Sequence, residues 1–111
     1  MIAVWHNDKF TDYYLGEGTL KGVTIHQVAQ VATDELEEAY RLTNNIDTCW
    51  IENSGVTPIG IKGEAARSTS VGDVLFLNDR GYVVESFGFR EIPREELTQV
   101  TFFLPPKGGS A

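Results

Sequence analysis

The pattern of apolar and polar residues predicts two β-strands in the first part of the chain. In residues 2–7, Ile2 and Val4 fall on one face and Trp5 on the other. In residues 23–31, the odd-numbered positions carry most of the apolar side chains. A period of two is typical of a strand whose faces differ in burial. We therefore predict strands over both segments, the second with one better-buried face.

A helix is predicted after these strands. Asp34 as N-cap and Glu37 three residues later form the sequence of a capping box. Leu36 and Tyr40 then recur at helical spacing, and the opposite side is mostly acidic. Glu37 and Arg41 can pair across one turn. The helix should pack through one face and expose an acidic one.

Two connections are rich in glycine and carry aromatic residues. Residues 12–18 place Tyr13 and Tyr14 among turn-forming glycines, which predicts a loop folded against the domain with the tyrosines as candidate contact residues. Residues 47–66 form a connection longer than compact domains usually contain. It is either a binding loop or an ordered crossover, and Trp50 would be its anchor.

The second half of the chain reads as a β-hairpin followed by a last strand. Two apolar runs, residues 71–77 and 82–89, are joined by a four-residue turn that ends in glycine. Residues 92–97 predict a turn or one helical turn begun by a proline, and residues 98–104 alternate as a strand. Residues 105–111 have little to bury and predict a flexible tail.

These elements predict a single α+β domain over residues 1–104. The sheet should be curved, mostly antiparallel and built of about five strands, with one principal helix against it. A length of 111 residues suits one domain. Exposed edge strands leave homodimerisation open.

Charge and cysteine content narrow the functional classes. Sixteen acidic residues against nine basic ones give a net charge of −7, and the basic residues are scattered, so direct binding to nucleic acid is not expected. The acidity serves either solubility or a basic partner. The chain has one cysteine, lacks a long apolar stretch and begins without a signal-peptide pattern, which predicts a cytoplasmic protein that does not bind membranes.

The sequence contains none of the common catalytic or cofactor motifs, such as GxSxG, the Walker A pattern or HExxH. We predict no catalytic residue, no metal and no cofactor. Cys49 is either a nucleophile or, as is commoner, a small buried apolar residue. His6 and His26 lie in predicted strands, where packed or surface histidines are commoner than metal ligands.

The segment before the hairpin is the most distinctive part of the chain. In one interpretation it is an anion or peptide site, in which Arg67 supplies a forked cation, Ser68 and Ser70 supply donors, and Tyr82 completes a pocket. In the other it is structural, with Asp73 bonding back to the serine-rich turn and Arg67 neutralising it. Both interpretations stay open at the level of sequence.

The same region resembles the YodL-like domain family. The matching stretches are the serine-rich residues 67–74, Gly81 with Tyr82, and the Ser-Phe-Gly-Phe of residues 86–89. Residues 38–47 are similar to the helix of small actinobacterial and actinophage members. Gly72 departs from the pattern, because many members carry a serine there. The resemblance implies a phage, plasmid or other mobile-element context, and it supplies no catalytic residue.

Three functions follow as hypotheses. The first is a non-enzymatic interaction module that binds a host or mobile-element protein through the acidic helix face and the loop before the hairpin. The second is a phosphate-mimicking inhibitor of a nucleic-acid-binding defence enzyme. Its mimicking carboxylates would be Glu35, Glu37, Glu38, Asp47 and Glu52. The third is a small-ligand binder or enzyme at the segment from Arg67 to Asp73.

Overall fold

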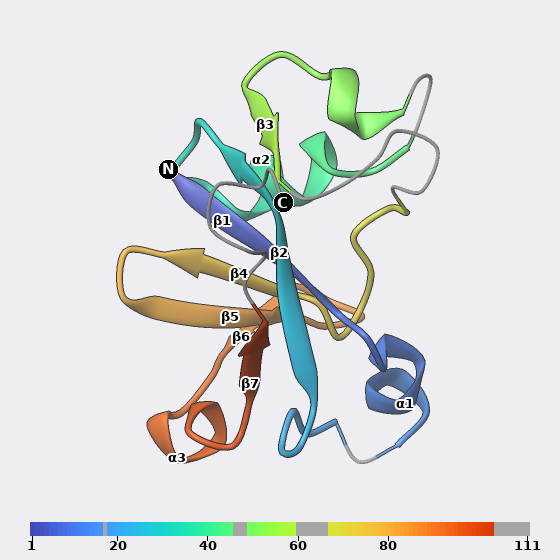
Figure 1. Cartoon of the computed structure of the whole chain (residues 1–111), viewed down its shortest axis with the longest axis vertical. Helices are drawn as coiled ribbons and strands as arrows, with labels where there is room; N and C mark the ends of the chain where they lie inside the picture. The colour runs from blue at the N-terminus through green and yellow to red at the C-terminus, as the bar shows by residue number, and fades with distance from the viewer. Residues whose placement is uncertain (17, 46–48, 60–66, 104–111) are drawn as a thin grey trace.

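The computed structural model describes residues 1–16, 18–45, 49–59 and 67–103. Within these residues the chain forms a seven-stranded, mostly antiparallel sheet in the order β3-β2-β1-β4-β5-β6, and β7 pairs in parallel with β2 (Figure 1). The strands are β1 (Ile2–Asn7), β2 (Thr24–Val31), β3 (Val56–Pro58), β4 (Val74–Leu77), β5 (Arg80–Val84), β6 (Phe89–Glu91) and β7 (Thr101–Phe103). The predicted tail, residues 105–111, and part of the 47–66 connection lie outside the described residues.

Short helices complete an α+β fold, as predicted. They are α1 (Phe10–Leu15), α2 (Leu36–Leu42), the 3-10 helix η1 (Trp50–Glu52) and α3 (Arg94–Leu97). The prediction of about five strands was wrong. The apolar run 82–89 is divided by a turn into β5 and β6, and Gly88 adopts a φ of 82° there. A further strand, β3, comes from the long connection.

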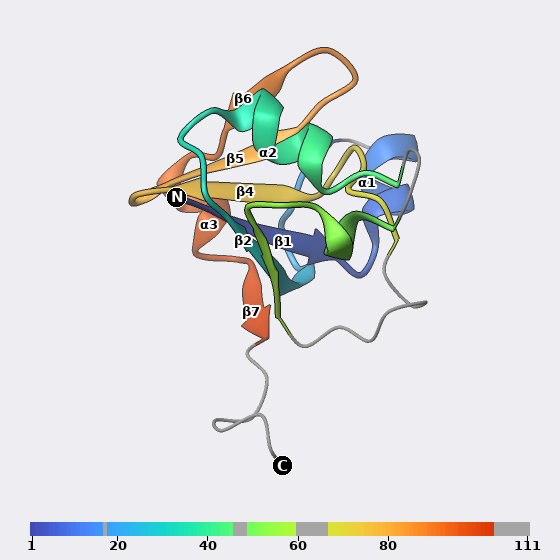
Figure 2. The ribbon, with the colours of Figure 1, turned by 90° about the horizontal axis from the view of Figure 1, so that it is seen from above.

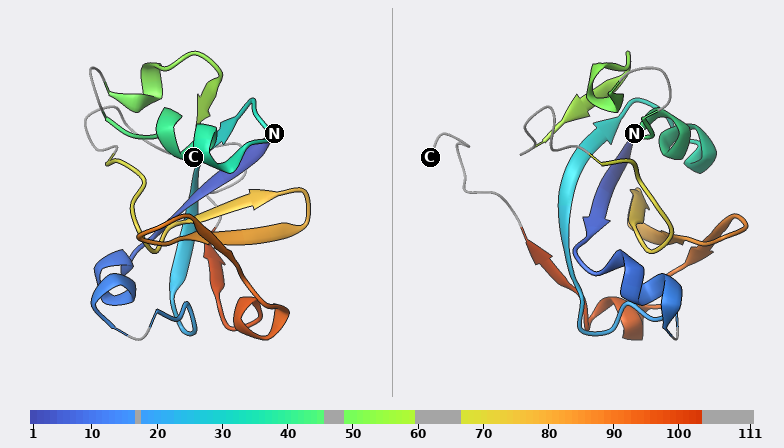
Figure 3. Two further views of the ribbon diagram at one scale, coloured as in Figure 1. Left: turned by 180° about the vertical axis from the view of Figure 1, so that it is seen from behind. Right: turned by 90° about the vertical axis from the view of Figure 1, so that its right-hand side faces the viewer.

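A β-bulge changes which face of β2 is buried. The pairing of β1 with β2 passes from Val4↔Ala29 to Trp5↔Gln27, so Val28 has no partner. An extra residue reverses the inward and outward sides of a strand. The strand was predicted correctly, and Ile25, Ala29 and Val31 are buried as predicted. These residues do not share one face, because Ile25 lies in one hydrophobic core and the other two lie in a second core. Figure 3 shows how strongly β2 curves.

The bulge lets the sheet serve two hydrophobic cores. One contains Ile2 and Val4 and packs beneath α2 and Trp50, which is fully buried. The other contains Trp5 and packs with Tyr13 of α1. The first core accounts for the predicted anchoring role of Trp50.

Local contacts differ from the predicted capping pattern of the main helix. Glu35, not Asp34, is the N-cap of α2, and it makes no side-chain capping bond. The carboxylate of Asp34 instead accepts a hydrogen bond from the N-terminal ammonium of Met1 at 2.6 Å. Arg41 pairs with Glu38, not with the predicted Glu37. The capping box is absent because Asp34 is bound to the N-terminal ammonium. Arg41 pairs with Glu38 because residues at i,i+3 spacing are also neighbours on a helix surface.

The remaining predictions were partly correct. The predicted loop at residues 12–18 is largely the helix α1. The hairpin of β4 and β5 is confirmed, but its turn is Asn78-Asp79, tighter than predicted, with a φ of 59° at Asn78. The predicted helical turn is α3 and the last strand is β7. Among the described residues, no helix is long and apolar enough to cross a bilayer.

Candidate functional site

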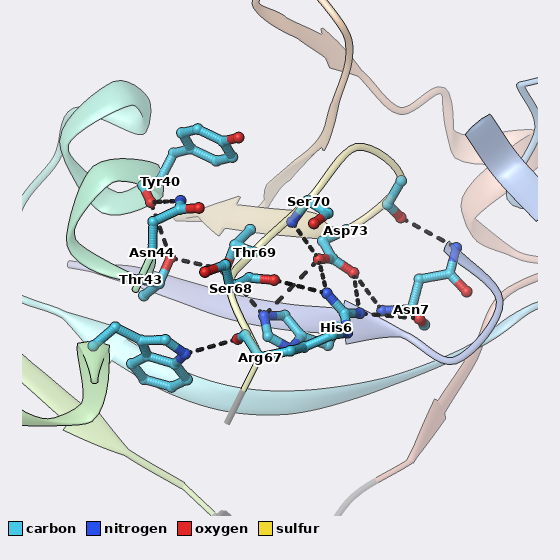
Figure 4. A network of polar contacts seen from close by, with 12 residues as sticks. His6, Asn7, Tyr40, Thr43, Asn44, Arg67, Ser68, Thr69, Ser70 and Asp73 are labelled. Atoms are coloured by element: carbon cyan, nitrogen blue, oxygen red, sulfur yellow. Dashed lines mark hydrogen bonds and ion pairs between the residues drawn. The ribbon is translucent and has the colours of Figure 1, made fainter. Parts of the chain in front are cut away.

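The carboxylate of Asp73 is the centre of a buried polar network (Figure 4). Its Oδ1 accepts hydrogen bonds from the backbone N–H of Asn7 and from Arg67, both at 2.8 Å. Its Oδ2 accepts from Arg67 and from the backbone N–H of Ser70, both at 2.7 Å. Asp73 is fully buried, so these donors replace the water that it loses on folding. The network fastens the segment before the hairpin to the end of β1.

Arg67 is held from several sides. Besides its two bonds to Asp73, its terminal nitrogens donate to the backbone carbonyls of Ser68 and Asn7. The guanidinium lies over the ring of Phe10, 4.0 Å from the centroid. Each terminal nitrogen already serves two acceptors, which uses four of the five N–H donors of an arginine. Little donor capacity is left for an anionic ligand.

The other residues of the hypothetical ligand site do not gather around Arg67. The hydroxyl oxygen of Ser68 accepts the N–H of Asn45. Ser70 borders a small hollow of about 280 Å³ that also contacts α1. Tyr82 lies in β5, opposite Leu75 of β4, and borders a different hollow beside the hairpin turn. The geometry therefore favours the structural interpretation of this segment.

A chain of hydroxyl groups connects His6 to α2. The hydroxyl of Thr43 donates to the carbonyl of Ala39 at 2.9 Å, and the hydroxyl of Thr69 donates to that of Thr43 at 2.8 Å. Since both hydroxyl protons are used, the 3.0 Å contact between His6 Nε2 and Thr69 requires that His6 donate. A neutral His6 therefore carries its proton on Nε2. The chain ties β1, the segment before the hairpin and α2 together.

Burial of His6 makes its protonation costly. Desolvation lowers its pKa from 6.5 to about 4, and the nearby Asp73 only partly offsets this shift, while Arg67 and His26 add to it. The folded state therefore disfavours the imidazolium form across the intervening pH range.

We expect the protein to lose stability as the pH falls through this range. Because the pKa of His6 is lower in the folded than in the unfolded state, its contribution is complete above pH 6.5 and lost towards pH 4. The loss should be on the order of 3 kcal/mol, measured by urea unfolding at each pH. His6→Gln should flatten this part of the profile, whereas His26→Gln should leave it in place. An unchanged slope in His6→Gln would refute the assignment.

A second charged network joins β6 to α3 and α1. Arg90 donates to both carboxylate oxygens of Glu96, at 3.0 and 3.1 Å, and to Glu85 at 3.1 Å. The hydroxyl of Tyr13 donates to Glu85, and burial together with this bond raises the pKa of Tyr13 to about 12. Burial alone would raise the pKa of Glu96, but the bonds from Arg90 and from the N–H of Leu20 outweigh it and lower that pKa. These contacts are structural.

A groove of about 460 Å³ lies between α2 and the turn that joins β5 to β6. Figure 2 shows this turn and β6 beside α2. Its aromatic part consists of Tyr40 and Phe89, whose rings meet edge to face at 6.3 Å. Four glutamates line it together with one arginine. We call it the α2–β6 groove, and its charged residues are Glu35, Glu37, Glu38, Glu85 and Arg41.

Phe87 lies in the same turn, between Ser86 and Gly88, which line the groove. Its side chain is 97% exposed, whereas Phe89, two residues later, packs against the first core. The sequence analysis did not single out Phe87, because the run 82–89 reads as one continuous strand. The signal that could have revealed it is the Ser-Phe-Gly sequence, which breaks that run.

The remaining candidates lie elsewhere. Cys49 is partly buried and packs against the first core, as a small apolar residue would. Glu52 is exposed on η1, and Asp47 lies outside the described residues. Among the described residues, no three histidine, cysteine or acidic side chains lie close enough together to hold a metal ion.

Comparison of the chain with family models, with curated proteins and with solved structures gives no match. The resemblance to the YodL-like domain family therefore stays a prediction.

Proposed function

We propose that this chain is a non-enzymatic protein-interaction module of a mobile element and that it binds its partner through the α2–β6 groove. The main support is Phe87, whose side chain is almost completely exposed in a turn whose neighbouring residues Ser86 and Gly88 line the groove. Aromatic residues are enriched in protein–protein interfaces relative to the rest of the protein surface. The mobile-element setting rests on the family resemblance.

The charges of the groove define the kind of partner. Arg41 is paired with Glu38, and Glu85 is paired with Arg90. Glu35 and Glu37 are exposed and have no ion-pair partner among the described residues. The groove therefore carries an uncompensated negative charge, which is complementary to a basic segment.

The other large groove is less suited to this role. It measures about 630 Å³ and lies beside the hairpin turn and α3. Asp79 and Glu91 line it together with Arg80 and Arg94, so its charges balance. It also lacks an exposed aromatic comparable to Phe87, since Phe102 packs against Trp5 and Phe76.

The phosphate-mimic hypothesis uses part of the same surface. The exposed, unpaired Glu35 and Glu37 favour it, whereas the pairing of Glu38 with Arg41 reduces the charge available for mimicry. A phosphate mimic should bind through charge alone, so its complex should weaken steeply with salt and be insensitive to Phe87. An interaction module should depend on Phe87 as well.

Affinity capture of a partner with matched variants tests the proposed function. The immobilised protein would be incubated with host lysate at low and at high salt, and the captured proteins identified by mass spectrometry. Phe87→Ala should remove about 2 kcal/mol or more of binding, as is typical of an aromatic hot spot, and the Glu35→Gln/Glu37→Gln double variant should weaken capture of a basic partner. Thermal unfolding should be unchanged in both, because these side chains are exposed.

The matched controls lie on the other side of the sheet. Phe103→Ala removes a different exposed aromatic, 57% exposed, and Glu95→Gln removes a different exposed carboxylate. Both should capture the partner like the original chain. If Phe103→Ala abolished capture and Phe87→Ala did not, the α2–β6 groove would not be the contact surface. Capture that is unchanged in Phe87→Ala but lost at high salt would favour the phosphate mimic.

A further inference from the structure

The strand β6 lies at the end of the sheet order, and only β5 pairs with it. Two hydrogen bonds beyond the strand ends show how the pairing alternates. The backbone N–H of Ile92 donates to the carbonyl of Gly81 at 2.8 Å, and the N–H of Glu85 donates to the carbonyl of Gly88 at 3.0 Å. In an antiparallel ladder, hydrogen-bonded pairs alternate with pairs that make no such bonds.

Val83 lies opposite Arg90, midway between these two hydrogen bonds. By the alternation, Val83 and Arg90 therefore form a hydrogen-bonded pair. Phe89 and Glu91 are in the alternate pairs, so their backbone N–H and C=O groups point away from β5. Neither residue makes another backbone hydrogen bond within the described part of the chain. The edge therefore presents two donors and two acceptors in the spacing of a strand.

The opposite edge of the sheet differs in one respect. There the bonds from Ile59 to Val28 and from Ala32 to Gly55 show that Pro58 directs its nitrogen outward from β3. A proline at such a position removes the donor that an added strand would need, which is a common protection of sheet edges. The β6 edge has no proline between Phe89 and Glu91.

We propose that the β6 edge pairs with an extended, basic segment of the partner protein, which adds a strand to the sheet. This inference rests on the proposed function and specifies how the partner binds. Side chains that alternate along the added strand on the side of Phe89 would reach the α2–β6 groove, where Glu35 and Glu37 are unpaired. Main-chain bonds supply affinity in this mode, and alternate side chains supply specificity. Lysine or arginine is expected at every second position.

A second copy of this chain is a poorer occupant of the edge. Pairing of β6 with β6 would bring two acidic surfaces together in a molecule with a net charge of −7. Like charges placed opposite each other weaken strand pairing. The charge of the groove thus selects a basic strand.

A proline substitution tests the backbone contact separately from the side chains. Glu91→Pro removes the outward N–H and leaves the ladder with β5 complete, whereas Glu91→Gln keeps the N–H. The probe is a fluorescein-labelled seven-residue peptide of alternating lysine and valine, followed by fluorescence anisotropy. We expect Glu91→Pro to weaken binding about tenfold or more and Glu91→Gln to keep most of the affinity. Thermal unfolding identifies whether each variant is folded.

A second probe keeps the test decisive if Glu91→Pro does not fold. A peptide of the same sequence with N-methyl groups on every internal backbone nitrogen should bind the original chain about tenfold more weakly, because neither edge of the added strand keeps its donors. Equal binding of both peptides, or wild-type affinity of a folded Glu91→Pro, would overturn strand addition. Loss of binding in Phe87→Ala together with wild-type affinity in Glu91→Pro would overturn strand addition but leave the proposed function standing.

A dimer that Glu91→Pro converts to a monomer would show that a second copy occupies the edge, which contradicts the proposal.

Discussion

Replacing Arg67 with alanine is expected to lower the free energy of unfolding by about 3 kcal/mol. The carboxylate of Asp73 is fully buried, and Arg67 supplies two of its four hydrogen bonds and its compensating charge. Removing one partner of a buried ion pair leaves the other charge without compensation, which costs more than the pair itself contributes. The guanidinium is partly exposed, so the loss should fall at the lower end of the range for buried pairs. Urea unfolding followed by circular dichroism measures the change.

Arg94→Ala is the matched control, because Arg94 is exposed and makes no ion pair with the described residues. It should change stability by less than about 0.5 kcal/mol. A stable Arg67→Ala that has lost a small anionic or peptide ligand would contradict the structural role and restore the ligand-site hypothesis.

Replacing Trp50 with alanine should cost about 3–5 kcal/mol. The indole is fully buried in the first core, and its Nε1–H donates to the carbonyl of Arg67 at 2.7 Å. The substitution removes both a large apolar surface and the bond that ties η1 to the segment before the hairpin. The midpoint of thermal unfolding, followed by circular dichroism, should fall accordingly.

Trp50→Phe separates the two contributions. It keeps most of the apolar volume and removes the indole N–H, so the loss should be about 1–2 kcal/mol, including the unpaired carbonyl. If Trp50→Ala retained nearly full stability, Trp50 could not be the anchor of the connection, and its role as a contact residue would have to be reconsidered.

The strands were predictable because successive residues of a strand point to opposite faces, which leaves an alternating pattern in the sequence. Ile2 and Val4 alternate with Trp5, and the structure places them in two cores. The bulge at Val28 was not predictable, because it depends on how β2 pairs with β1 and leaves no local pattern in the sequence. The capping box failed because Asp34 reaches the N-terminal ammonium, a contact between residues far apart in sequence.

The candidate site was predictable only in part. The composition of the segment before the hairpin indicated a cluster of Arg67 with Asp73, and the structural alternative named the bonds that are observed. The groove could not be predicted, because it is formed where α2 meets the β5–β6 turn, two segments separated by more than forty residues in the sequence. Phe87 was missed because a strand was assigned across it.

We propose that the contact surface is the α2–β6 groove with the β6 edge, and that the cluster of Arg67 with Asp73 is structural. A titration of the isotopically labelled protein with the lysine–valine peptide, followed by two-dimensional amide NMR, distinguishes these two roles. We predict that the largest shifts fall on Glu35, Glu37, Phe87 and Glu91, while the amides of Asn7 and Ser70, which bond to Asp73, stay unchanged. Shifts centred on Asn7 and Ser70, or on Arg94 and Phe102 beside the other groove, would contradict the account.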